Sequence, residues 1–152
     1  MNSIRIAVLS VVALSAIISA GSVWAIDKAL AKRASLDGTW GEDCEKPGPR
    51  TVYSMSPEGA LSYQIIMYPN TVRIEGEVTK IEPRSGGQFY WEARGTDKRA
   101  GPFSGASISQ MNGSTRKVFF SEVTSAGEKK KLIDDGKIVA TGKEVPLQYR
   151  CE

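Results

Sequence analysis

The residues at positions 72–79 read VRIEGEVT, and this alternation of apolar and charged side chains is typical of a β-strand. Val72, Ile74 and Val78 share one face of such a strand, while the charged side chains share the other. One face is therefore expected to be buried and the other exposed to solvent, as is common in antiparallel sheets.

The chain repeats this pattern in short pieces from Leu36 onward. No stretch keeps a 3.6-residue apolar period for three turns, whereas β-branched and aromatic clusters recur between turn residues. Asn112-Gly113 and Asp135-Gly136 supply the positive φ angles that tight hairpins need. Besides residues 72–79, strands are expected at 38–43, 51–55, 61–67, 88–93, 104–111, 116–124, 130–134, 137–141 and 147–150.

These strands predict an all-β fold. Sequential antiparallel strands joined by hairpins form a meander, and about eight of them can close into an up-and-down barrel. We therefore expect one antiparallel barrel domain over residues 36–152, with a two-sheet sandwich as the alternative. No internal repeat or linker divides this range.

Cys44 and Cys151 are the only cysteines. In an oxidising compartment an even count favours a bridge, so we expect a Cys44–Cys151 disulfide, with two free thiols as the alternative. The bridge requires the first and last segments of the domain to come within about 7 Å at Cα. A closed barrel brings its first and last strands together in this way.

The N-terminus has the three-part layout of a signal peptide. Arg5 is followed by an uncharged apolar run from Ile6 that ends in small residues. We expect cleavage after Ala25 and a periplasmic or secreted protein. The uncharged stretch at 6–26 has 21 residues, enough to span a bilayer, so an uncleaved inner-membrane anchor is the alternative.

Residues 26–35 form a basic leader to the domain. They suit a short helix or a frayed arm that carries Lys28, Lys32 and Arg33, which are available to anionic headgroups. Because chain ends are often poorly ordered, a solvated leader is the favoured interpretation.

The segment Leu36-Asp37-Gly38-Thr39-Trp40 resembles the Gly-x-Trp signature that opens the lipocalin and wider calycin barrels. In that family the Trp closes the barrel floor and an Arg from the last strand packs over it. The resemblance thus implies structural roles for Gly38, Trp40 and Arg150. The chain is also similar to alphaproteobacterial periplasmic proteins with a Gly-x-Trp start, a nearby Cys and an Arg-Cys end. Periplasmic metalloprotease inhibitors of the same barrel class share the Gly-x-Trp start.

The composition excludes much of the usual catalytic chemistry. The chain has no histidine, which removes Ser-His-Asp and Cys-His catalysis and the commonest metal ligand. Bridged cysteines would be unavailable to zinc. No Gly-rich phosphate loop follows a strand and opens a helix. We therefore expect no enzyme activity, no catalytic residues, no cofactor and no metal site.

Two groups of residues, one basic and one aromatic, are candidates for binding a partner. Lys129-Lys130-Lys131 would form a patch for an anionic partner, although the acidic residues nearby favour a solvated hairpin. Phe89 and Trp91 lie on one face of an expected strand, where an outward ring would mark a binding surface.

The predicted function is a non-catalytic periplasmic binding module for a small apolar ligand or an envelope protein. An inhibitor of an envelope hydrolase and a structural envelope component are the alternatives. An eight-stranded barrel has room for packed side chains or one small ligand, and the short chain favours the packed version. The 20 basic and 17 acidic residues nearly balance, so no nucleic acid is expected. Membrane contact is expected only through an uncleaved N-terminal segment.

Overall fold

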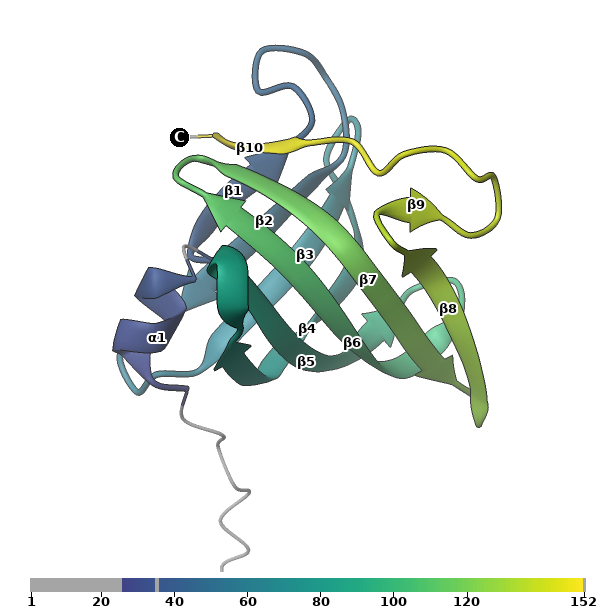
Figure 1. Cartoon of the computed structure of the whole chain (residues 1–152). Helices are drawn as coiled ribbons and strands as arrows, with labels where there is room; N and C mark the ends of the chain where they lie inside the picture. Colours follow the sequence, from purple (N-terminus) through teal and green to yellow (C-terminus); the bar gives the residue numbers. More distant parts are fainter. Residues whose placement is uncertain (1–25, 35, 152) are drawn as a thin grey trace, which may run out of the picture.

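The structure is a computed structural model that describes residues 26–34 and 36–151 (Figure 1). The predicted signal peptide lies outside these residues. The elements, in chain order, are α1 (Lys28–Arg33), β1 (Gly38–Gly41), β2 (Arg50–Met55), β3 (Leu61–Met67), β4 (Thr71–Pro83), the 3-10 helix η1 (Ser85–Gly87), β5 (Gln88–Asp97), β6 (Gly101–Asn112), β7 (Thr115–Ser125), β8 (Glu128–Asp134), β9 (Lys137–Ile138) and β10 (Gln148–Cys151).

The strands form one antiparallel sheet that closes on itself. Strands β1 to β9 pair in chain order, and β10 pairs with both β1 and β7. Strands β1 to β7 and β10 therefore make a closed eight-stranded barrel, which confirms the predicted fold class. On the same edge of β7, β10 pairs with residues 115–116 and β8 pairs with residues 121–125. Strands β8 and β9 thus extend beside the ring (Figure 1).

All ten expected strands have counterparts in the described part of the chain. Strands β4 and β5 are longer than expected because they stay paired with each other beyond residues 79 and 93, with a β-bulge in β4 between Val78 and Lys80. The hairpin turns carry the positive φ angles that the sequence indicates, at Gly113 (61°), Asp135 (46°) and Gly136 (72°).

The predicted disulfide is confirmed. Cys44 and Cys151 are bonded, with their Cα atoms 5.4 Å apart, and the bridge spans 107 residues of sequence. It joins the segment after β1 to the end of β10, the two strands that pair where the ring closes. The bridge also fits a chain that folds outside the reducing cytoplasm.

Helix α1 covers one end of the barrel (Figure 1). The Asp27 carboxylate caps it by accepting hydrogen bonds from the backbone N–H groups of Ala29 (2.8 Å) and Leu30 (3.3 Å). Ala31 and Ala34 are fully buried and belong to the hydrophobic core. The leader is thus a short helix packed on the barrel, and the interpretation of a wholly solvated leader is wrong.

In the part of the chain that the structure describes, no helix has the length and apolar character needed to cross a bilayer.

Candidate functional site

The barrel interior contains a buried cation. Arg116 is only 3% exposed, and its guanidinium carbon lies 5.1 Å from the ring centroid of Trp40 and 5.3 Å from that of Tyr53. Its Nε and Nη2 donate to Oε1 of Gln148 at 2.8 and 2.5 Å, and its Nη1 donates to the Tyr53 hydroxyl at 3.1 Å. Among the described residues no carboxylate forms an ion pair with Arg116. Its charge is therefore stabilised by two aromatic faces and neutral acceptors.

The arginine that packs over Trp40 is thus Arg116 of β7. The family resemblance implied Arg150 of the last strand for this role, and that expectation is wrong. Arg150 is the register partner of Trp40, but its side chain is exposed. The guanidinium lies instead against Gly38, where an added Cβ would be 3.1 Å from Nε of Arg150. Gly38 has a φ of 114°, so the position needs glycine for its backbone as well as for this contact.

The candidate binding residues Phe89 and Trp91 do not form an outward surface. Phe89 is 8% exposed in the core, and Nε1 of Trp91 donates to Oγ of Ser109 at 3.3 Å. The Trp91 ring also meets the ring of Tyr53 edge to face, with centroids 6.3 Å apart. Both side chains therefore face the barrel interior, and the ring on the outer face is Tyr90.

Tyr90 lies among charged groups on the outer face of the sheet. Its hydroxyl donates to Oε1 of Glu92 at 2.7 Å, while Nζ of Lys80 and Cζ of Arg84 lie 5.7 and 5.0 Å from its ring centroid. The hydrogen bond to Glu92, together with burial and nearby carboxylates, raises the pKa of Tyr90 to about 12. A groove of about 740 Å³ passes this ring and extends to Lys129.

The lysine triplet lies on β8, which is partly an edge strand. β8 pairs with β9 only at Ile133 and Asp134, and the Leu132 carbonyl accepts from the Val139 N–H, so residues 128–131 have no backbone partner on that side in the described chain. Lys129 pairs with Glu122 at 2.7 Å, and Lys131 pairs with Asp134 at 3.2 Å. These contacts fit the solvated-hairpin interpretation. Lysines on an exposed edge also discourage pairing with another chain, and a binding role for the triplet stays a prediction.

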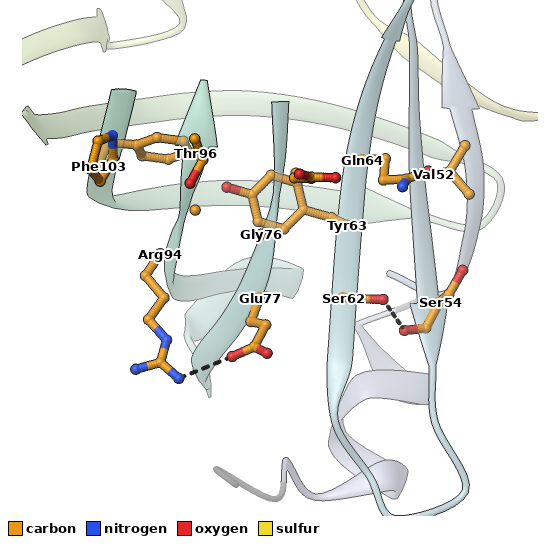
Figure 2. Close-up of a pocket in the computed structure, with 13 residues that line it drawn as sticks. Val52, Ser54, Ser62, Tyr63, Gln64, Gly76, Glu77, Arg94, Thr96 and Phe103 are labelled. Atoms are coloured by element: carbon orange, nitrogen blue, oxygen red, sulfur yellow. Dashed lines mark hydrogen bonds and ion pairs between the residues drawn. The ribbon is translucent and has the colours of Figure 1, made fainter. Parts of the chain in front are cut away.

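A larger open groove of about 770 Å³ runs across strands β2 to β6 (Figure 2). Its walls carry hydroxyl, amide and charged groups, with the Arg94–Glu77 ion pair at 3.1 Å and a hydrogen bond from Ser62 Oγ to the Ser54 carbonyl at 3.2 Å. The lining residues are Val52, Ser54, Ser62, Tyr63, Gln64, Glu75, Gly76, Glu77, Arg94, Gly95, Thr96, Pro102 and Phe103. None of them was a predicted binding residue, because only the strand register brings these five strands together.

Two glycines shape this groove. Gly76 of β4 and Gly95 of β5 are register partners, and an added Cβ on Gly76 would lie 2.3 Å from the Arg94 carbonyl oxygen and 2.9 Å from Cε1 of Tyr63. An added Cβ on Gly95 would lie 2.4 Å from the Glu75 carbonyl oxygen. In Figure 2 the Tyr63 ring extends across Gly76. Because no side chain fits at either position, the two strands approach closely there.

Four carboxyl groups of the described residues have lowered pKa values. The pKa of Asp97 is lowered, chiefly by a hydrogen bond from the Arg99 backbone N–H, and that of Glu144 is lowered by a hydrogen bond from Lys117. The carboxyl pKa values of Asp43 and Glu58 are also lowered. Within the described ranges, no group of three or more Asp, Glu or Cys side chains is placed to hold a metal ion.

The fold and the ring closure define an all-antiparallel eight-stranded barrel that is compatible with a calycin-like fold. Comparisons with protein-family models, curated proteins and solved structures gave no match. The functional proposals below therefore depend on the geometry of this chain alone.

Proposed function

We propose that the chain is a non-catalytic binding module of the periplasm that recognises a protein partner on its outer surface. The observation that carries this proposal is the packing of side chains around Arg116 inside the barrel. Arg116 is stacked against Trp40 and Tyr53, and the Ser107 hydroxyl donates a hydrogen bond to the Ser121 hydroxyl at 3.0 Å. An eight-stranded barrel is just wide enough for its own side chains to fill it. A carrier of an apolar ligand needs that space empty.

The groove across β2 to β6 is the proposed contact surface. It is open, and its lining combines Ser, Thr and Gln with charges of both signs. Such a lining offers donors and acceptors to a polypeptide backbone and to polar side chains, while Pro102 and Phe103 add apolar contact. A small apolar ligand would leave most of these polar groups without partners.

The carboxyl groups support a non-catalytic role. A general acid that works near neutral pH needs a raised pKa, whereas the shifts of Asp43, Glu58, Asp97 and Glu144 are all downward. Surface hydrogen bonds and ion pairs explain these shifts.

An inhibitor of an envelope hydrolase is the alternative, and the structure restricts how it would work. The N-terminal arm cannot enter a partner's cleft while Ala31 and Ala34 are buried in the core. Deleting residues 26–35 would uncover that core, so loss of binding after this deletion would not identify the arm as the contact. An inhibitor of this shape would have to act through a loop.

Native mass spectrometry of the protein purified from the periplasm tests the proposal. We expect an added mass of protein size that Ser62→Arg in the groove abolishes. Ser85→Arg, an equal change at an exposed position in η1, should retain it. A co-purifying small molecule that both variants keep, or no added mass at all, would refute the proposal.

A further inference from the structure

A small basic cavity lies at the end of the barrel that α1 covers. Its volume is about 330 Å³, and it is more enclosed than the groove of Figure 2. It is lined by Lys28, Lys32, Asp37, Met55 and Arg150. Three cations therefore surround one small space with a single carboxylate among its lining residues.

The helix places two of these cations. Lys28 and Lys32 are four residues apart in α1, so they lie on the same face of the helix, one turn apart. The buried residues Ala31 and Ala34 fix the helix against the barrel. Nζ of Lys28 also donates to the carbonyl oxygen of Pro57, which ties α1 to the turn between β2 and β3.

The third cation comes from the last strand. Arg150 lies opposite Trp40 in the register, and its guanidinium packs against Gly38. Any larger residue at Gly38 would push on Nε and Nη2, which lie 3.1 and 3.2 Å from the added Cβ. Among the described residues the Arg150 guanidinium has no ion pair or side-chain hydrogen bond. Its planar fork of N–H donors thus remains available in the cavity.

We propose that this cavity binds a phosphate group carried by an organic molecule. A guanidinium binds phosphate with two parallel hydrogen bonds, and ammonium groups add point charges. The lining has an excess of two positive charges, which matches a phosphomonoester of about −1.5 to −2 at pH 7 better than a single carboxylate. Met55 lies beside the cations and would contact the carbon attached to the phosphate.

The phosphate has two possible sources, a soluble phosphomonoester or a lipid headgroup. The cavity adjoins α1, the first helix of the described chain, and the apolar segment precedes this helix in the sequence. A chain that kept this segment would hold the basic end close to the bilayer surface, where anionic headgroups attract lysine and arginine. The site is separate from the groove, so it does not depend on the protein partner proposed above.

The test measures binding of glycerol 3-phosphate to the disulfide-bonded protein by calorimetry, with glycerol as the uncharged probe. Arg150→Gln should weaken phosphate binding about tenfold or more, because it removes charge-assisted hydrogen bonds. Arg99→Gln, the same charge change in the turn between β5 and β6 at the other end of the barrel, should leave the affinity unchanged. Asp37→Asn should strengthen binding by up to about fivefold, since it removes the opposing charge.

Vesicles distinguish the two sources. Co-sedimentation with phosphatidic acid vesicles but not phosphatidylcholine vesicles, lost in Arg150→Gln, would assign the phosphate to a lipid. Binding to glycerol 3-phosphate alone would assign it to a soluble molecule. If Arg150→Gln unfolds the protein, Lys32→Gln replaces it. The proposal would be overturned if the Arg150 and Arg99 variants bound glycerol 3-phosphate and phosphatidic acid vesicles with equal affinity. It would also be overturned if the protein bound neither of them.

Discussion

Replacing the buried cation tests whether the interior is a packed core. Arg116→Ala would remove three hydrogen bonds of a charged group and two cation–π contacts. It would leave Gln148 Oε1 and the Tyr53 hydroxyl without these donors. Folding of the wild-type chain costs several kcal/mol to desolvate the guanidinium, and the alanine variant avoids this cost, so the net loss is much smaller than the sum of the contacts. We expect the free energy of unfolding to fall by about 3–5 kcal/mol, because two acceptors lose their donor and the missing side chain leaves a cavity.

The assay is equilibrium unfolding in urea, followed by tryptophan fluorescence with the disulfide intact. With a slope near 2 kcal/mol/M, a loss of about 4 kcal/mol moves the midpoint down by about 2 M. Arg116→Met is the matched variant, because its side chain fills much of the space without charge. Its cost should be about 1–3 kcal/mol, the penalty for acceptors that have lost their donor. A loss below about 1 kcal/mol for Arg116→Ala would show that the cation does not hold the interior together.

Three further predictions concern the closure, the strands and the outer face. Reduction of the disulfide, which closes a segment of 107 residues, should cost about 4–5 kcal/mol of unfolding free energy in the same assay with reductant, and a cost below 1 kcal/mol would contradict it. Gly76→Ala should lower the free energy of unfolding by about 3 kcal/mol or more, because the added Cβ would clash with backbone atoms. Gly113→Ala, which has open space but a φ of 61°, should lower it by about 1–2 kcal/mol. Equal urea midpoints for the two variants would refute the argument that the strands approach closely at Gly76. Glu92→Gln should lower the pKa of Tyr90 from about 12 toward its usual 10 in a 295 nm titration. Because the folded pKa is the raised one, the stability that this hydrogen bond adds is present below pH 10 and is lost as the pH approaches about 12. An unchanged titration would contradict this.

The fold was predictable because its signals are local. Alternation over residues 72–79 defines a strand wherever that segment lies, and Asn112-Gly113 defines a turn by its own backbone preference. The disulfide pairing needed only the count of cysteines and an oxidising compartment. Closure of the ring then followed from the bridge, and the β1–β10 register confirms it.

The candidate sites were less predictable because they depend on tertiary partners. Nothing local distinguishes Arg116 from any other arginine in a strand, since its burial requires Trp40, Tyr53 and Gln148 around it. The groove draws on five strands, and its shape depends on two glycines that face each other in the register. One signal was available in the leader: the spacing of Leu30, Ala31 and Ala34 gives α1 an apolar face.

Arg116 packs against Trp40 and Arg150 packs against Gly38 at the same end of the barrel. The two arginines differ in burial, and we expect them to differ in role for that reason. Arg116 is buried against the Trp40 ring, and its N–H groups donate to neutral partners, so this cation stabilises the core. Gly38 leaves room for Arg150, which is exposed and faces a cavity with two lysines, so its charge remains available to a ligand. Substitution of Arg116 should therefore change stability, while substitution of Arg150 should change phosphate affinity at nearly constant stability. If both variants instead lost the same unfolding free energy, the basic cavity would be a part of the core rather than a site.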